Sequence, residues 1–137
     1  MAVVRCGERI CLARRSALVA TGRGLWSVVT GYLEPAATPE AQAWTELDEE
    51  LGLRPPGLRL TRALEPVHLT SPASGREFLV HPFLFECEPG YQLALNWEND
   101  EAAWVEPARL DEPDCVRWQS PLVRALLESP ACSGQSA

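Results

Sequence analysis

The sequence predicts one domain of mixed α+β or layered α/β/α structure rather than a parallel doubly wound sheet. Its 137 residues, 46% of them hydrophobic, are enough for a single core and too few for two domains. Short apolar segments with strand character lie before and after a helix whose two ends are both marked by capping residues. An amphipathic segment near the end of the chain predicts a second helix.

The strands are expected in the order of the chain, each bounded by turn-forming residues. Residues 3–15 predict two strands around a turn at Gly7-Glu8, and a loop at 16–24 follows. Further strands are expected at 25–29, 58–67, 77–85, 92–96 and 102–105, with an edge or a bulge at Pro82 because proline cannot donate to a ladder. One turn of helix is expected at 107–110 and the closing helix at 119–127. The domain is expected to span 1–128, followed by a disordered tail at 129–137.

The central helix is expected to run from Pro39 to Leu51. Thr38 is a favourable N-cap, Pro39 suits the first helical position and Gly52 suits the C-terminal stop. At about 100° per residue, the apolar residues of this segment share one face. Those residues are Ala43, Trp44, Leu47 and Leu51.

A neighbouring face of the same helix carries Glu46, Glu49 and Glu50. Glu46 and Glu50 are a like-charged i,i+4 pair near the negative end of the helix dipole, so these acids do not stabilise the helix. Carboxylates on successive turns can converge on a hard divalent cation such as magnesium. A solvated acidic face is the alternative interpretation.

Charge and cysteine content exclude several other classes. The net charge of −7 argues against binding to a nucleic acid duplex or an anionic membrane, because both need a basic surface. The five cysteines have irregular spacing and no Cys-x-x-Cys pair, so reduced thiols are expected. No basic segment followed by an apolar segment begins the chain, and we expect a cytoplasmic protein without a membrane span.

Gly31 and the run Glu46-Leu47-Asp48-Glu49-Glu50-Leu51-Gly52-Leu53 resemble the signature of the Nudix hydrolase family. That signature reads Gly, five residues, Glu, seven residues, Arg-Glu-apolar-x-Glu-Glu-x-Gly-apolar. Two positions differ, with Ala37 in place of the upstream glutamate and Thr45 in place of the arginine. The segments Arg14-Arg15-Ser16, Gly24-Leu25-Trp26 and 98–105 also resemble the family, so the likeness covers nearly the whole chain.

The resemblance implies an α/β/α sandwich with a mixed β-sheet and an enzyme that cleaves a diphosphate linkage. The substrate would be a nucleoside diphosphate linked to another moiety, hydrolysed with Mg²⁺ or Mn²⁺. Glu46, Glu49 and Glu50 would be catalytic and would bind the metal, with the Gly31 carbonyl and Glu98 as further ligands. Glu46 is the expected general base, and Glu98 or Glu101 is the alternative.

Substrate contacts are expected from residues near the predicted site. Arg14 and Arg23 would bind phosphate, and the ring of Trp26 would stack on a base. Because Ala37 and Thr45 depart from the signature, one alternative is a weakened Nudix module that binds a nucleotide or a protein without turnover. An interaction protein with an acidic patch is another. A homodimer also stays open, in which a second copy covers the edge of the first strand.

Overall fold

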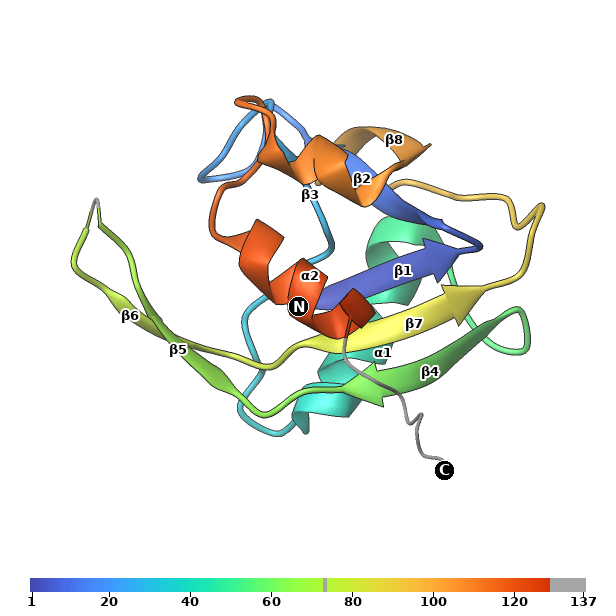
Figure 1. Cartoon of the computed structure of the whole chain (residues 1–137), viewed down its shortest axis with the longest axis horizontal. Helices are drawn as coiled ribbons and strands as arrows, with labels where there is room; N and C mark the ends of the chain where they lie inside the picture. Colours follow the sequence, from blue (N-terminus) through green and yellow to red (C-terminus); the bar gives the residue numbers. More distant parts are fainter. Residues whose placement is uncertain (73, 129–137) are drawn as a thin grey trace.

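A computed structural model describes residues 1–72 and 74–128 of the chain (Figure 1). Its centre is a mixed six-stranded sheet with the order β3-β2-β1-β7-β4, to which β8 is added through β2. β1 and β7 are parallel, and the other pairs are antiparallel. The strands of this sheet are β1 (Ala2–Cys6), β2 (Arg9–Arg15), β3 (Trp26–Ser27), β4 (Leu58–Ala63), β7 (Phe83–Cys87) and β8 (Asn99–Val105).

The sheet branches at β2, which pairs with β1, β3 and β8. One edge of β2 pairs with β8 from Ile10 onward. The other edge pairs first with β1, at Arg9 and Ile10, and then with β3, at Ala13 and Arg14. β1 and β3 therefore occupy successive halves of the same edge, and the chain leaving β3 runs past the start of β1, where Ala2 bridges Val29.

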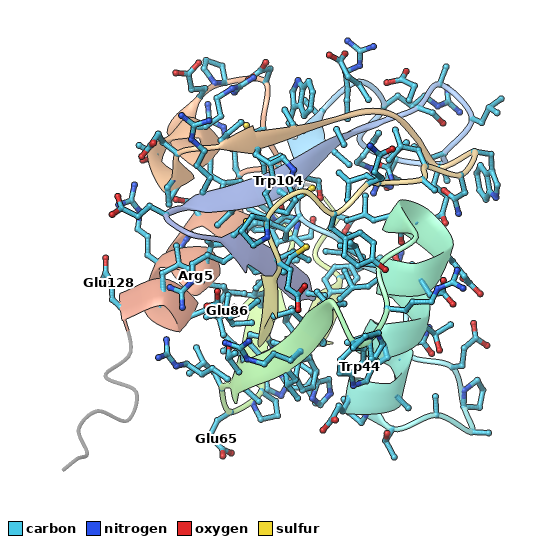
Figure 2. The ribbon with its side chains drawn as sticks, turned by 90° about the vertical axis from the view of Figure 1, so that its right-hand side faces the viewer. Arg5, Trp44, Glu65, Glu86, Trp104 and Glu128 are labelled. Carbon is cyan, nitrogen blue, oxygen red and sulfur yellow. The ribbon has the colours of Figure 1, made fainter. Side chains whose placement is uncertain are left out.

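Two helices cover opposite faces of the sheet, as Figure 2 shows. Alternate residues of the strands face opposite sides, so neighbouring positions of one strand contribute to two separate cores. Val4, Cys11 and Phe85 pack with helix α1 (Pro39–Leu51), whereas Val3, Ile10 and Leu84 pack with helix α2 (Gln119–Glu128). The α/β/α sandwich with a mixed sheet in a single domain is thereby confirmed.

Helix α1 begins and ends at the expected residues. The Thr38 hydroxyl accepts a hydrogen bond from the Ala41 amide, and Gly52 adopts a left-handed conformation with φ of 69°. Ala43, Leu47 and Leu51 are buried, and the ring of half-buried Trp44 lies edge-on to Phe85 with 4.8 Å between centroids (Figure 2). The apolar face of α1 is therefore the one that the sequence predicts.

The prediction of two long strands at 58–67 and 77–85 is wrong, because each of these segments is divided between two strands. The chain leaves the sheet after β4 and forms a separate hairpin of β5 (Val67–Thr70) and β6 (Glu77–Val80). Figure 1 shows this hairpin projecting from the sandwich as an arm. Its base is closed where the Leu64 amide donates to the Pro82 carbonyl at 3.1 Å. Pro82 marks the break between β6 and β7 because it has no amide proton for a ladder.

Two smaller differences concern short segments that were expected as strands. The expected strand at 92–96 does not form, and the strand expected at 25–29 is reduced to β3. The turn of helix at 107–110 is the 3₁₀ helix η1 (Pro107–Asp111). The expected tail at 129–137 lies outside the described residues.

Free thiols and short helices are found within the described part of the chain. Cys6, Cys11, Cys87 and Cys115 are free thiols, and Cys132 is outside the described residues. Neither α1 nor α2 is long and apolar enough to cross a membrane.

Candidate metal centre

Three carboxylates from two elements meet at one end of the sheet. Glu46 and Glu50 lie on successive turns of α1, and Glu98 lies in the turn that leads into β8. One oxygen from each of these side chains lies within 4.8 Å of the other two. We call Glu46, Glu50 and Glu98 the acid cluster, and in residues 1–72 and 74–128 it is the one group of this kind.

Glu50 is the buried member of the acid cluster. Only 5% of the surface of Glu50 is exposed. Asn99 Nδ2 donates a hydrogen bond to Glu50 Oε1 at 3.1 Å. Its Oε2 is buried and has no hydrogen-bond partner among the described residues. Burial, the contact with Glu46 and the charge of Glu98 together raise the pKa of Glu50 to about 9. A carboxylate in such a position is costly unless a positive charge accompanies it.

Glu46 is held between a glycine and a glutamine. A Cβ placed on Gly31 would come within 2.6 Å of Glu46 Cδ, so only glycine leaves room for this carboxylate. Gln42 Nε2 donates to Glu46 Oε2 at 2.8 Å, which leaves Oε1 free of that bond. The backbone at Gly31 therefore lies beside the Glu46 carboxylate.

The turn that carries Glu98 is fixed to the end of β2. Ser16 donates from its amide to the Glu98 carbonyl at 2.9 Å and from its hydroxyl to the Trp97 carbonyl at 2.7 Å. Asn96 Nδ2 donates to Glu98 Oε1 at 3.1 Å. Glu98 is therefore oriented by contacts that do not involve α1.

The donor set fits a hard divalent cation. Carboxylate oxygens are the ligands that Mg²⁺ and Mn²⁺ prefer. The buried Oε2 of Glu50 is the observation that favours a cation, because it has no hydrogen-bond donor among the described residues.

With this geometry established, comparison with known proteins identifies the family. The family model described as NUDIX domain matches residues 1–126. The chain belongs to the NUDIX domain family. No curated protein matches it.

Solved structures with the NUDIX fold resemble this one over most of its length. A Caenorhabditis elegans Ap4A hydrolase in a binary complex covers 90% of each chain at 18% identity, with a TM-score of 0.70. A Nudix hydrolase of M. smegmatis, RenU, covers 90% of this chain and 79% of its own at 15% identity, with a TM-score of 0.71. A bifunctional NMN adenylyltransferase/ADP ribose pyrophosphatase of Francisella tularensis reaches 0.74 at 20% identity, over 93% of this chain and 39% of its own. At these identities the likeness concerns the fold.

The other residues expected in the NUDIX site lie in different surroundings. Glu49 is exposed and stands outside the acid cluster. Arg14 pairs with Asp100 at 2.8 Å and with Glu101 at 3.4 Å. Arg23 donates to the Val19 carbonyl at 2.7 Å within the 16–24 loop.

Trp26 packs on the α2 side of the sheet, whereas Glu46 and Glu50 come from α1 on the other side. The guanidinium of Arg109 lies 5.9 Å from the centroid of the Trp26 ring. The roles expected for Trp26, Glu49, Arg14 and Arg23 stay predictions.

Two residues of the site escaped sequence analysis. Gln42 lies one helical turn before Glu46, a spacing at which side chains meet, but the helical pattern places it beside the apolar face. Asn99 directly follows Glu98, and only the pairing of β8 with β2 turns it toward α1. The i,i+4 spacing of Gln42 and Glu46 could have indicated that Gln42 contacts this carboxylate. No local pattern indicated the contact of Asn99.

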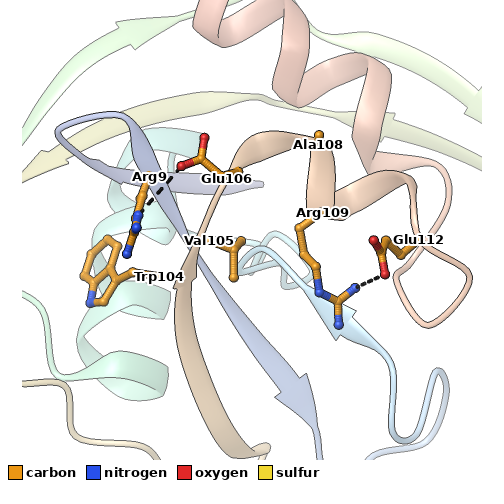
Figure 3. A pocket seen from close by; sticks show the side chains of 7 residues that line it. All are labelled: Arg9, Trp104, Val105, Glu106, Ala108, Arg109 and Glu112. Atoms are coloured by element: carbon orange, nitrogen blue, oxygen red, sulfur yellow. Dashed lines mark ion pairs between the residues drawn. The ribbon is translucent and has the colours of Figure 1, made fainter.

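A cavity of about 500 Å³ lies elsewhere on the NUDIX domain, as Figure 3 shows. Residues of β2, β8 and η1 and the turn after η1 line it, and none belongs to the acid cluster. Its charged side chains already have partners, since Arg9 pairs with Glu106 and Arg109 with Glu112, each at 3.8 Å. The cavity is therefore separate from the acid cluster.

Proposed function

We propose that this NUDIX-domain protein is a pyrophosphohydrolase that uses Mg²⁺ or Mn²⁺. Its substrate would be a nucleoside diphosphate linked to another moiety, in which water attacks phosphorus and breaks the diphosphate linkage. The observation that carries this proposal is the buried, unpartnered Oε2 of Glu50 beside Glu46 and Glu98. Three carboxyl groups this close together need a divalent cation before the site can accept a phosphate group.

Glu46, Glu50 and Glu98 would hold the cation, with the Gly31 carbonyl and Glu49 as the further ligands that the family resemblance implies. The cation would supply positive charge to the diphosphate oxygens and would acidify a water molecule. Glu98 would reach the cation from the turn before β8, whose backbone is bonded to Ser16. Helix α1 and the turn before β8 would thus each supply ligands that their own backbone contacts hold in place.

Glu46 is the proposed general base. Gln42 occupies its Oε2, so Oε1 would receive the proton of the attacking water. Attack by water needs no covalent intermediate. Arg14, Arg23 and Trp26 stay proposals as substrate contacts, and Arg14 would have to exchange an acidic partner for phosphate.

The structural neighbours support the substrate class. One is an Ap4A hydrolase and another carries an ADP ribose pyrophosphatase activity. Both names denote compounds in which phosphates join a nucleoside to a second group. We therefore propose a substrate of this kind for the present chain.

The test is hydrolysis of a substrate panel with the purified full chain and Mg²⁺. The panel holds nucleoside diphosphate sugars, ADP-ribose, dinucleotides and nucleoside triphosphates. We expect release of a monophosphate or phosphate that stops with EDTA and in Glu50→Gln and Glu49→Gln. Glu40→Gln is the matched control, because Glu40 is an exposed acid on the same helix outside the acid cluster.

Each outcome of the panel separates the proposal from its alternatives. Binding of a nucleotide without any product favours a weakened binding module. Turnover that persists at the wild-type rate in Glu50→Gln contradicts the role of the acid cluster. No effect of Mg²⁺ on either turnover or thermal stability favours an interaction protein with an acidic patch.

A further inference from the structure

The loop between Gly31 and Ala37 has one hydrogen bond to the rest of the described protein, and Gln42 makes it. The Glu34 amide donates to Gln42 Oε1 at 3.1 Å. The other hydrogen bond found in this loop, from the Ala37 amide to the Glu34 carbonyl at 3.0 Å, is internal. Gln42 itself is nearly buried, with 9% of its surface exposed.

The other end of the same side chain faces the acid cluster. Gln42 Nε2 donates to Glu46 Oε2 at 2.8 Å. One amide group therefore uses its oxygen for the loop and its nitrogen for the carboxylate. A buried amide with both ends bonded has a single orientation, because turning it over would place oxygen against oxygen.

The two contacts converge on the same point of the site. The loop begins at Gly31, whose backbone lies against the Glu46 carboxylate, and its Glu34 amide is attached through Gln42 to that same carboxylate. Ala37 is half-buried and has no polar side-chain group. Thr45 is exposed, and its hydroxyl makes no hydrogen bond to the loop among the described residues.

We propose that Gln42 is a positioning residue that fixes Glu46 and the Gly31–Ala37 loop as one unit for cation binding. This inference rests on the proposed function, because it assigns Gln42 to the site that holds the cation. Without Gln42, Glu46 can rotate away from Glu50 and Glu98, and the loop loses its attachment to α1. The cation must then order both groups on binding, which weakens its affinity.

Gln42→Met tests the proposal, because methionine fills a similar volume and provides neither hydrogen bond. In the metal-free protein we expect faster hydrogen exchange of the Glu34 amide, while the Leu47 and Leu51 amides inside α1 keep their protection. The Mg²⁺ concentration that gives half of the thermal stabilisation should rise about 10- to 100-fold, as for other residues that orient metal ligands. Gln92→Met is the control, because Gln92 is exposed and makes no side-chain hydrogen bond in the described residues.

A second variant, Gln42→Glu, separates the two ends of the side chain. It keeps an acceptor for the Glu34 amide, so exchange of that amide should stay as slow as in the wild type. Exchange of the Glu34 amide in the wild type as fast as in an unstructured peptide contradicts the loop contact even where Gln42→Met does not fold. Equal exchange and equal Mg²⁺ midpoints in wild type and Gln42→Met would overturn the proposal and leave Gln42 a core residue.

The exchange measurement needs neither metal nor substrate. A protein that hydrolyses its substrate but shows no effect of Gln42→Met keeps the proposed function and loses this inference. A protein without turnover that shows the exchange effect and the Mg²⁺ shift loses the hydrolase assignment and keeps the positioning role.

Discussion

Asn99 Nδ2 donates to one oxygen of Glu50 at 3.1 Å, while the other oxygen of Glu50 is buried without a partner. One amide hydrogen bond does not balance the desolvation of a carboxylate together with the charges of Glu46 and Glu98, so the pKa of Glu50 rises to about 9. Glu50 is therefore a source of pH-dependent instability in the metal-free protein.

We expect the free energy of unfolding of the metal-free protein to fall as the pH rises. Between the ordinary pKa of 4.5 and the folded value of about 9, Glu50 keeps a proton in the native state that the unfolded chain releases. Stability therefore declines through this window, by at most about 1.4 kcal/mol per pH unit. Glu50→Gln should flatten this decline in urea unfolding with EDTA present. Parallel pH profiles for the two proteins would refute the assignment to Glu50.

Divalent cation should reverse that instability. We expect Mg²⁺ to raise the melting temperature of the wild type, with about 2.7 kcal/mol of stabilisation at 100 times the dissociation constant. EDTA should remove the effect, and Glu50→Gln should not show it. A melting temperature that rises equally in Glu50→Gln and in the control Glu40→Gln would indicate a general salt effect.

Gly31→Ala should damage the site more than the fold. The added Cβ would lie 2.6 Å from Glu46 Cδ, and the mobile end of that side chain can move aside. We expect unfolding free energy within about 1 kcal/mol of the wild type, but weaker Mg²⁺ stabilisation and slower turnover. Gly7→Ala provides a comparison, since a Cβ at Gly7 meets no atom within 4 Å although φ is +62°. Wild-type Mg²⁺ affinity in Gly31→Ala would show that the close approach is unimportant.

Gln119→Leu should damage the fold more than the site. Gln119 is 1% exposed and stands at the start of α2. Its Oε1 accepts from the Val28 amide at 3.0 Å and its Nε2 donates to Ser27 Oγ at 2.9 Å. Leucine leaves the Val28 amide buried without a partner, which costs about 1–3 kcal/mol.

Urea unfolding measures that cost, and Gln92→Leu at an exposed position is the control, expected within about 0.5 kcal/mol of the wild type. The Mg²⁺ affinity of the folded fraction should be unchanged, because Gln119 packs on the face opposite α1. A Gln119→Leu protein as stable as the wild type would mean that another acceptor, in place of the glutamine oxygen, bonds the Val28 amide.

Helix α1 was predictable because its determinants are local. Thr38 and Gly52 cap it from within its own segment, and the spacing of Ala43, Leu47 and Leu51 identifies the buried face. The convergence of Glu46 with Glu50 follows from the same period. Glu98 was reached through resemblance, since no local pattern links a turn before β8 to a helix far earlier in the chain.

The arm formed by β5 and β6 and the hydrogen bond from Asn99 to Glu50 were not predictable from the sequence. Strand pairing decides both. Residues 58–67 and 77–85 have continuous strand character, and the departure of β5 and β6 from the sheet depends on which partners β4 and β7 find. Asn99 faces Glu50 only because β8 pairs with β2 with a register shift between Arg14 and Arg15. Registers of this kind are set by the whole sheet and not by one segment.

The hydrogen bond between Glu50 and Asn99 spans 49 positions of the chain, which has a consequence for folding during synthesis. Helix α1 leaves the ribosome with both of its caps long before β8 exists. Contacts between distant residues form late, after the loops between them have closed. A nascent chain therefore carries Glu46 and Glu50 without Glu98 or Asn99, and the acid cluster is assembled only when β8 docks on β2.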